Sequence, residues 1–417
     1  MAAAARRTTM PLNRLSQVLA THVAGLEEAG TAKGAESVVV EVRPAEGDRG
    51  PRFLLQGEGE REFIRMNSNS YLGMGLRPEV IEAEERATRA FGAGPGGVRF
   101  ISGTYRIHLE LEAKLAAFHG RESAMIFSSA YAAILSTITP LVTADTVLIS
   151  DALNHNCIIN AMRLARPQAK VVYPHLDLEA LDNALADHAG KAKRALVVTD
   201  GIFSMRGDHA PLDEIMEIAR RHDDAYEENV VVVADDSHGV GALGATGRGV
   251  EELTGSEPVD VLVGTLGKAF GVNGGYVTSS AAVIGFLRET SPMYIYSNPI
   301  TVGEASAALR SLEIVDSDEG RALLDRLRSL TRRFEEGLGR IGIETIPGEH
   351  PVVPLMIRDT GKTHDLVRYL YENGVLVTGL AYPVVPKGDE EIRAQVNTDH
   401  TEADIDQVLD LLAAYQG

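Results

Sequence analysis

The chain has 417 residues, of which 44% are hydrophobic and 24% are charged, so its composition excludes a disordered or fibrous protein and its length suits about two or three subdomains. Its 40 lysines and arginines against 59 aspartates and glutamates give a net charge of −19, which disfavours a broad nucleic-acid-binding face but allows a local pocket for an anion. The single cysteine, Cys157, excludes an intrachain disulfide, and no apolar run approaches the roughly 18 residues of a membrane span. We therefore expect a cytoplasmic protein without a membrane span.

The beginning of the chain has two interpretations. The opening, MAAAARRTTMPLNRLSQ, contains arginines but no acidic residue, which is typical of a mitochondrial transit peptide. The stretch LNRLSQVLATHVAGLEEAG instead places apolar residues at helical spacing along one stripe: Leu12, Leu15, Val18, Leu19, Val23 and Leu26. We favour a disordered start followed by this helix. Two short strands around a glycine turn, ESVVVEVRP and RFLLQGEGEREFIRM, are expected after it.

From about residue 77 the sequence alternates between two patterns. Helical stretches such as PEVIEAEERATRAF and DEIMEIARRH separate short apolar runs: SAMIF, TVLIS, KVVYP, RALVVTD, NVVVVADD and VDVLVGT. This alternation predicts an α/β domain whose mostly parallel sheet is covered on both faces. After about residue 300, a long helical region, further short strands and a last helix predict a smaller α+β domain. We divide the chain into residues 1–66 with the first helix and strands, a large domain at 67–300 and a small C-terminal domain at 301–417.

Polar side chains follow three of the apolar runs, and ligands of open α/β sheets bind at the carboxyl ends of strands. The runs deliver Asp235, Asp236, Ser237 and His238, then Asp200 and Ser204, and finally Thr265 and Lys268. Singly, each has an ordinary structural explanation, because an aspartate after a strand often caps a helix and a lysine among glycines often lies in a surface loop. The combination is much harder to obtain by chance, and we expect these loops to converge.

Such a set meets the chemical needs of pyridoxal phosphate. A partly desolvated Lys268 has a lowered pKa and can form a Schiff base with the cofactor's aldehyde. Asp235 or Asp236 would keep the pyridine nitrogen protonated, so that the ring accepts electron density from a carbanion. His238 would hydrogen-bond the ring oxygen, and Thr265 with exposed backbone N–H groups would hold the phosphate. We expect no metal in this site.

Two motifs establish a family resemblance. VVVADDSHGVGALGATGRG followed by GTLGKAFG resembles the α-oxoamine synthases, fold-type I pyridoxal-phosphate enzymes that condense an amino acid with an acyl-CoA and lose carbon dioxide. The similarity extends from Asn67 to Thr401 and includes NSYLG, GPGGVRFISGTYRIHLELEAKLAAFHG, DALNHNCIINAMRL, TDGIFSMRGDHAPLDEI and MYIYSN. Within the family, YPVVPKGDEEIRAQVNTDHT is most similar to the glycine C-acetyltransferase branch, also called 2-amino-3-ketobutyrate CoA ligase. The resemblance implies the fold-type I transferase fold.

The resemblance also implies roles for individual residues. Around the cofactor ring it places Lys268 as the Schiff-base lysine, Asp235 on the pyridinium, His238 on the phenolic oxygen, His155 stacked over the ring and Ser204 beside it. The phosphate would be bound by Thr265 and the backbone of Ala130 and Tyr131, with Ser297 reaching the phosphate of a neighbouring subunit, and Asn69 and Arg393 would hold the amino-acid carboxylate. A guanidinium grips a carboxylate through two parallel hydrogen bonds, which supports Arg393 independently; its ordinary alternative is a surface arginine. A homodimer with shared active sites follows from the resemblance.

Several positions depart from the family pattern. Relatives commonly carry glycine or cysteine at Ala130, asparagine at Ile134, alanine and serine at Asn156 and Cys157, and aspartate at Arg206. These departures leave the acyl donor open.

The reaction expected from the resemblance is the condensation of a small amino acid, glycine first, with acetyl-CoA or a longer acyl thioester. CoA is released, and the product is an α-amino ketone or a 2-amino-3-ketoacid. The alternatives are a synthase that uses alanine, serine or a carrier-protein thioester, and a fold-type I aminotransferase or lyase. A non-catalytic subunit of a heteromeric synthase is a further alternative, but such subunits typically lack the Schiff-base lysine, and this chain has Lys268.

Overall fold

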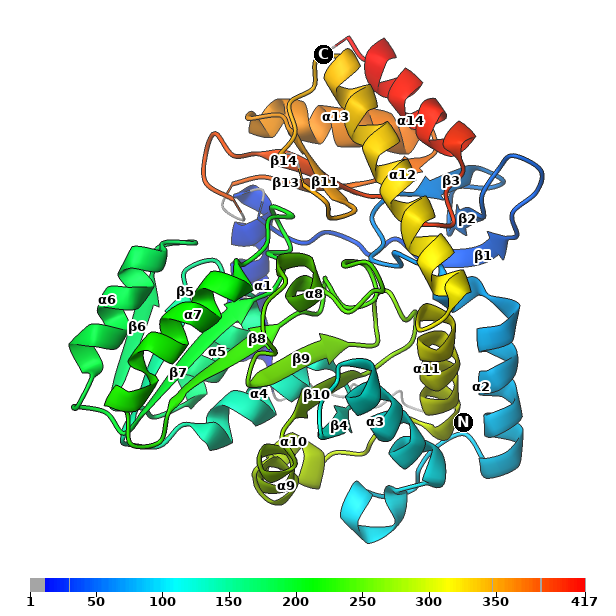
Figure 1. Cartoon of the computed structure of the whole chain (residues 1–417). Coiled ribbons are helices and arrows are strands. Elements are labelled where there is room, and N and C mark those ends of the chain that lie inside the picture. The colour runs from blue at the N-terminus through cyan, green and yellow to red at the C-terminus, as the bar shows by residue number, and fades with distance from the viewer. Residues whose placement is uncertain (1–11, 30, 347, 383–384, 417) are drawn as a thin grey trace, which may run out of the picture.

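The computed structural model describes residues 12–29, 31–346, 348–382 and 385–416. The transit-peptide interpretation concerns mainly residues 1–11, which lie outside these ranges. Figure 1 shows a large α/β body and, at one end of it, a smaller group of strands and helices built from the C-terminal part of the chain. The α/β class predicted from the sequence is therefore confirmed.

A seven-stranded sheet forms the centre of the large body, in the order β4, β10, β9, β8, β7, β5, β6 (Figure 1). Its strands are β4 (Ser123–Phe127), β5 (Thr146–Asp151), β6 (Ala169–Tyr173), β7 (Arg194–Asp200), β8 (Val230–Asp235), β9 (Val261–Thr265) and β10 (Gly275–Ser279). Neighbours from β9 to β6 are parallel, whereas β10 is antiparallel to β4 and β9. The predicted parallel sheet is confirmed, with β10 as its exception because the short loop between β9 and β10 leaves no room for a crossover helix.

Helices cover both faces of this sheet. They are α3 (Arg106–Phe118), α4 (Ala130–Leu141), α5 (Asn156–Leu164), α6 (Leu178–His188), α7 (Leu212–His222), α8 (Val250–Thr254), α9 (Ala281–Thr290) and α10 (Pro292–Ile295). Successive strand residues point to opposite faces, so Val147 and Val197 enter the core that includes α6 and α7, while Leu148 and Val198 enter the core that includes α4 and α5. Burial on both faces explains why the strands are almost continuously apolar.

A second sheet, β11 (Val352–Met356), β14 (Glu391–Gln395) and β13 (Thr378–Leu380), is antiparallel throughout and belongs to the C-terminal part. Its helices are α12 (Asp318–Arg340), α13 (Thr360–Glu372) and α14 (Glu402–Ala414). Helix α11 (Val302–Val315) packs on α2 (Pro78–Phe91) and α3, and it begins at a reciprocal cap between Thr301 and Glu304. Three short helical turns also lie in the described ranges: η1 (Met74–Leu76), η2 (Arg99–Gly103) and η3 (Asp223–Ala225).

The first strands of the chain pair with its C-terminal part. Strands β1 (Val39–Arg43), β2 (Arg52–Leu55) and β3 (Glu62–Arg65) form a sheet whose last member is β12 (Val375–Leu376), which runs parallel to β3. Segments more than three hundred residues apart in the sequence thus share one sheet. The domain boundaries after residues 66 and 300 stay predictions.

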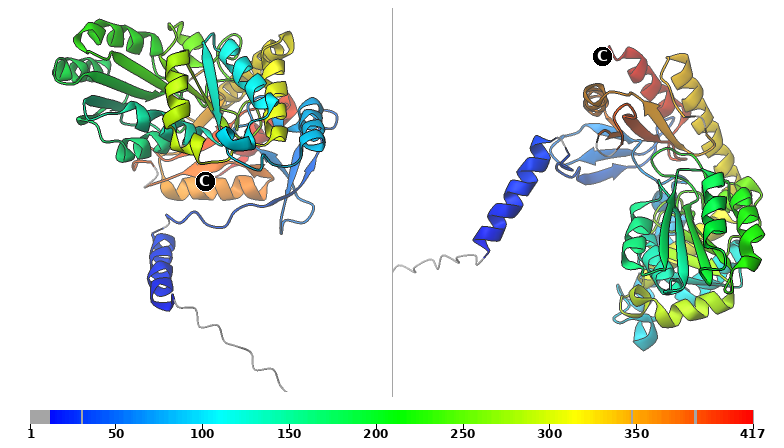
Figure 2. Two further views of the ribbon diagram at one scale, coloured as in Figure 1. Left: turned by 90° about the horizontal axis from the view of Figure 1, so that it is seen from below. Right: turned by 90° about the vertical axis from the view of Figure 1, so that its left-hand side faces the viewer.

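The predicted N-terminal helix is present as α1 (Asn13–Glu28). Its apolar stripe is exposed, from 37% at Leu26 to 65% at Val18, and no residue of the helix is buried. Figure 2 shows α1 projecting away from the rest of the chain. A single short helix is marginal in water without packing, and in the described ranges no other element covers this stripe. No helix in the described ranges combines the length and apolar character needed to cross a membrane.

Candidate active site

A cavity of about 270 Å³ opens at the carboxyl ends of the central strands. Eight of the eleven predicted site residues line it: Ala130, Tyr131, His155, Ser204, Asp235, His238, Thr265 and Lys268. They come from the ends of β7, β8 and β9 and from the starts of α4 and α5. The structure therefore brings together the loops that the sequence predicts to converge, because parallel strands place their carboxyl ends at one edge of the sheet.

Lys268 lies in the loop that follows β9 and reaches this cavity. Burial lowers the pKa of its ammonium to about 8, although the charges of Asp235 and Asp200 act in the opposite direction. About a tenth of such a lysine is a neutral amine at pH 7. The site thus provides the nucleophilic amine that Schiff-base formation needs.

The glycines around Lys268 have a packing reason. Gly271 has a φ of 69°, and a Cβ there would lie 2.3 Å from the backbone nitrogen of Gly75. Gly275 sits against the start of α4, where a Cβ would lie 2.2 Å from the backbone nitrogen of Ala130. Close approach of backbone to backbone holds the lysine loop and the helix start together. Only glycine fits these positions without displacing backbone.

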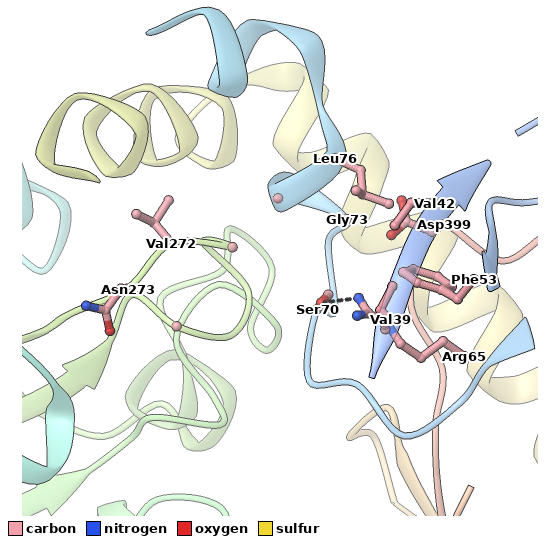
Figure 3. A pocket seen from close by; sticks show the side chains of 13 residues that line it. Val39, Val42, Phe53, Arg65, Ser70, Gly73, Leu76, Val272, Asn273 and Asp399 are labelled. Atoms are coloured by element: carbon pink, nitrogen blue, oxygen red, sulfur yellow. Dashed lines mark hydrogen bonds between the residues drawn. The ribbon is translucent and has the colours of Figure 1, made fainter. Parts of the chain in front are cut away.

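A larger cavity, of about 450 Å³, lies beside the same loop (Figure 3). Arg65 lies over the Phe53 ring there, 4.1 Å from its centroid, and donates to Ser70 Oγ at 3.4 Å. Among the residues lining this cavity only Arg65 and Asp399 are ionisable, and none of the predicted site residues contributes. Because the converging reactive groups face the smaller cavity, we take that one as the candidate active site.

The two aspartates after β8 have different surroundings. Asp235 faces the cavity, where its Oδ1 accepts a hydrogen bond from Ser237 N at 3.1 Å. Asp236 points away from the cavity, because its Oδ2 accepts the Val250 N–H at 2.8 Å at the start of α8. The choice between these residues, which strand position alone leaves open, therefore favours Asp235 as the partner of the pyridine nitrogen.

His155 begins α5 and is held by its neighbours. Its Nδ1 accepts the Cys157 N–H at 3.3 Å and lies 2.9 Å from Cys157 Sγ, while its backbone N–H donates to Asp200 Oδ2 at 2.9 Å. Burial lowers the pKa of His155, so the ring is neutral at pH 7. With Nδ1 acting as acceptor, the hydrogen-bond network assigns the ring proton to Nε2.

His238 is the end of a buried hydrogen-bond network. Its Nδ1 lies 2.7 Å from the Tyr71 hydroxyl, which is also 3.3 Å from Asn69 Oδ1. Asn69 Oδ1 in turn accepts from Arg393 Nη2 at 3.2 Å and from Gln395 Nε2 at 3.3 Å. Burial, reinforced by the charge of Lys268, lowers the pKa of His238 well below its usual range. The network joins the predicted carboxylate-binding residues to the cavity, although Asn69 and Arg393 do not line it.

Three buried polar atoms on one face of β14 have no hydrogen-bond partner among the described residues. They are Glu391 Oε1, Arg393 Nε and Gln395 Oε1, at alternate positions that share a face of the strand. Buried polar groups normally find partners. Of these residues, Arg393 and Gln395 contact Asn69, and a ligand carboxylate would suit the free Nε–H of the Arg393 guanidinium.

The predicted phosphate-binding groups surround the start of α4. Ser129 caps this helix by accepting the Ala132 N–H, and the N–H groups of Ala130 and Tyr131 have no acceptor within the helix. Thr265 donates to Gly274 O at 3.2 Å and accepts the Gly267 N–H at 3.1 Å. Backbone donors at a helix start are suited to a phosphate.

Ser297 does not line the cavity of its own chain. It follows α10 beside Tyr296, whose side chain is 79% exposed. Its predicted contact with a neighbouring subunit's phosphate stays a prediction.

Several departures from the family pattern lie in or near the site. Cys157 donates its thiol to Asp235 Oδ2 at 3.6 Å, and burial raises the pKa of that thiol. Asn156 Oδ1 accepts from the Tyr131 hydroxyl at 2.9 Å. Arg206 forms an ion pair with Asp208 at 3.2 Å outside the cavity. Ile134 is buried in the core that includes α4.

Other residues of the site were not singled out as site residues from the sequence. Tyr71, Cys157, His350 and Gln395 contact predicted residues, and His350 donates from Nε2 to the His238 carbonyl at 3.0 Å. Asp200 was expected among the converging strand ends but was given no role, although it lines the cavity. The histidine and tyrosine contacts join positions far apart in the sequence and carry no local signal.

Comparison with known proteins places the chain in a family. A family model described as aminotransferase class I and II matches residues 61–412. The chain belongs to this family. It is 38% identical over 397 residues to the 8-amino-7-oxononanoate synthase of Symbiobacterium thermophilum, covering 95% of this chain and 96% of the relative. It is 36% identical over 407 residues to the mitochondrial 2-amino-3-ketobutyrate coenzyme A ligase of Homo sapiens, covering 97% of this chain and 93% of the relative.

A solved structure of Sphingomonas wittichii serine palmitoyltransferase matches with a TM-score of 0.86 and 28% identity, covering 97% of this chain and 98% of that one. All three relatives are α-oxoamine synthases, so the predicted resemblance and the fold-type I transferase fold are confirmed. The family is pyridoxal-phosphate-dependent. The two curated relatives carry different names and are about equally similar to this chain.

Proposed function

We propose that this α-oxoamine synthase condenses glycine with an acyl-CoA, acetyl-CoA or a longer thioester, and releases CoA. The observation that carries the proposal is the arrangement of Lys268, Asp235 and His155 around one cavity, joined through the Tyr71 network to Arg393 and Asn69. Pyridoxal phosphate, when bound, supplies an aldehyde for amines and a ring that accepts electron density from a carbanion.

The cavity fits that cofactor. Lys268 would supply the amine and the Asp235 carboxylate would accept a hydrogen bond from the pyridine nitrogen, and His238 and Ser204 line the same space. Thr265 and the free N–H groups of Ala130 and Tyr131 would hold the phosphate. The buried Ser237 Oγ and Asp200 Oδ1 have no partner among the described residues and are further polar atoms near this space.

Proton transfer falls to two residues. Neutral Lys268 Nζ removes the proton from the substrate's α-carbon, because its lowered pKa keeps a usable fraction unprotonated. His155 carries its ring proton on Nε2 and donates a hydrogen bond to the acyl oxygen as carbon–carbon bond formation places negative charge there. Arg393 and Asn69 orient the amino acid by its carboxylate, so that its α-carbon reaches Lys268.

A second candidate function is favoured by the relative from Symbiobacterium thermophilum, named as an 8-amino-7-oxononanoate synthase. The same residues would serve a synthase that takes another small amino acid, such as alanine or serine, or a carrier-protein thioester. An aminotransferase or lyase would use Lys268 and Asp235 but would release no CoA.

The proposed enzyme is a homodimer. Phe100 and Ile101 are 67% and 70% exposed on η2, although Arg99 beside them makes a buried bidentate ion pair with Glu112. A firmly held segment that presents large apolar side chains is typical of an interface. We expect Ile101→Glu to give a monomer by analytical ultracentrifugation and to weaken cofactor binding if Ser297 acts across the interface. A dimer that persists with Glu at this position would exclude η2 from the interface.

The deciding experiment combines spectroscopy with a thiol assay. Purified protein is titrated with glycine, alanine and serine while its visible absorption is recorded, and CoA release is then measured with a panel of acyl-CoAs. Glycine spectral changes together with CoA release support the proposal. Lys268→Ala is expected to lose the visible absorption of the bound cofactor, and retained absorption with full turnover would contradict the assignment of this lysine.

A further inference from the structure

His175 joins three segments beside the active site. It follows the edge strand β6, and its ring lies between two carboxylates: Nδ1 is 3.0 Å from Asp151 Oδ1 and Nε2 is 3.1 Å from Asp208 Oδ2. The ring also meets Phe203 edge-on, with the centroids 4.4 Å apart. Both ring nitrogens are therefore occupied by acceptors, which requires a doubly protonated imidazole.

The first carboxylate controls the turn that presents His155. Asp151 ends β5 and is 2% exposed. Its Oδ1 accepts the Leu153 N–H at 2.8 Å, and its Oδ2 accepts the Leu176 N–H at 2.9 Å. The chain then passes directly to His155, whose backbone N–H is bound by Asp200. Asp151 thus fixes the start of the turn and ties it to the end of β6.

The second carboxylate belongs to the loop that presents Ser204, and it ties this loop to His175. Asp208 closes this loop, since its carbonyl accepts the Phe203 N–H at 3.0 Å, and Phe203 O accepts the Gly207 N–H at 2.9 Å. The loop has no regular helix or strand of its own, and Ser204 and Ile202 line the cavity. The base of the loop is closed by the bridge between Ile202 and His209 and by the Ala210 N–H, which donates to Gly201 O at 2.9 Å, so the bond from His175 to Asp208 acts on the part of the loop beyond that base.

We propose that His175 is a positioning residue that holds, through Asp151 and Asp208, the two segments carrying His155 and Ser204 on either side of the cofactor cavity. This inference rests on the proposed placement of the cofactor between those two segments. His175 itself does not line the cavity, so it acts through the carboxylates and not on the substrate.

The ionisation of His175 supports the arrangement. Burial lowers the pKa of the ring, but the hydrogen bonds and charges of Asp151 and Asp208 outweigh it and raise the pKa to about 9. The other ionisable groups that interact with these carboxylates are Arg206 and Glu391 near Asp208, and Tyr173 and Asp200 near Asp151. The His175 ring is therefore positively charged at neutral pH, and it loses this proton as the pH rises through about 9.

The chain contains a matched control. His222 Nε2 lies 2.8 Å from Asp182 Oδ1, and its side chain is 18% exposed, the same as that of His175. That pair joins α7 to α6 and does not contact the cavity. His222→Ala removes one histidine–carboxylate contact and His175→Ala removes two, but only His175 contacts the segments that carry His155 and Ser204.

The test compares His175→Ala with His222→Ala by two measurements on the cofactor-free protein. Hydrogen exchange of the Phe203 and Gly207 amides is expected to accelerate about tenfold in His175→Ala only, because their loop is released. The dissociation constant of added pyridoxal phosphate is expected to rise about tenfold in the same variant and to stay unchanged in His222→Ala. Unchanged exchange and affinity in a folded His175→Ala would overturn the inference.

Two further results keep the test decisive. If His175→Ala does not fold, Asp208→Asn weakens the contact between His175 and the Ser204 loop and is expected to give the same accelerated exchange. Normal exchange of the Phe203 and Gly207 amides in Asp208→Asn would equally overturn the inference. Raising the pH from 7 to 10 accelerates amide exchange in any protein through base catalysis. In the unmodified protein the acceleration at the Phe203 and Gly207 amides is expected to be larger than in His175→Ala, because only the unmodified protein loses the charge of His175. The exchange measurement needs no cofactor, so its outcome is separate from that of Lys268→Ala, which tests the proposed function.

Discussion

Asp200 and Asp235 are register partners at the ends of β7 and β8, and both carboxyl groups are buried beside the Lys268 cavity. Burial and the charge of Asp235 raise the pKa of Asp200 well above its usual range. Asp200 Oδ2 accepts the His155 N–H, whereas its Oδ1 has no partner among the described residues. Burial thus favours the protonated form of Asp200, whereas Asp235 lines the cavity and is the carboxylate we propose for the cofactor nitrogen.

The different surroundings of Asp200 and Asp235 predict different outcomes when each is replaced by asparagine. Asp200→Asn supplies an uncharged side chain of the same shape whose amide oxygen accepts the His155 N–H, so turnover should stay within about threefold of the unmodified enzyme. Asp235→Asn removes the negative charge that stabilises a protonated pyridine, so turnover should fall about a hundredfold or more while the unfolding temperature changes little. Steady-state kinetics and thermal unfolding of both variants measure the difference. Equal losses in the two variants would show that the carboxyl groups share the role.

Arg393→Lys tests the carboxylate site. Lysine keeps the charge but loses the planar fork that gives two parallel hydrogen bonds, so KM for the amino acid should rise about tenfold to a hundredfold. The cofactor spectrum should not change, because Arg393 does not line the cofactor cavity. The control is Arg358→Lys, since Arg358 is an exposed ion-pairing arginine of the same small domain. A normal KM for Arg393→Lys would move the carboxylate elsewhere.

Glu391 predicts a pH-dependent stability. Burial raises the pKa of its carboxyl to about 7, above the value of about 4.3 in an unfolded chain. Between these pH values the folded state holds a proton on Glu391 that the unfolded state has released. The contribution of this proton to the free energy of unfolding is complete below the unfolded pKa and is lost as the pH rises through about 7. Glu391→Gln should therefore match the unmodified protein at pH 4 and be more stable at pH 8, by about 1–3 kcal/mol.

Thermal unfolding of the cofactor-free protein across this pH range measures the effect. The exposed Glu349 supplies the control, because Glu349→Gln should change stability by a similar small amount at every pH. A stability gain in Glu391→Gln that does not grow with pH would contradict the burial argument.

The sequence predicts the sheet and most of the cavity because both depend on local patterns. Lys268, Asp235 and His238 directly follow apolar strands, and the topology of a parallel sheet then brings strand ends together. The Tyr71–His238 bond could not be predicted, since it joins residues 167 positions apart with no local signal. The exposed stripe of α1 was equally unpredictable, because helical periodicity identifies an apolar face but not the surface that covers it.

Leu176 follows His175 in a backbone conformation that leucine rarely adopts. Its φ is 56°, in the left-handed region, and its N–H donates to Asp151 Oδ2. A side chain with a Cβ costs about 1 kcal/mol there, whereas glycine does not. Leu176→Gly should therefore be more stable than Leu176→Ala by about 1 kcal/mol, which reverses the usual order of these residues.

The comparison of glycine with alanine isolates the backbone, because both variants lose the packing of the leucine side chain. Urea unfolding of the two proteins measures the difference, and Ala186→Gly at an exposed position of α6 gives the ordinary order, a loss of about 1 kcal/mol. If alanine were the more stable residue at position 176, the left-handed conformation would not be held in solution. The Leu176 N–H donates to Asp151, the carboxylate that also contacts His175. If the Phe203 and Gly207 amides exchange faster in Leu176→Ala than in Leu176→Gly, the backbone strain at position 176 reaches the Ser204 loop.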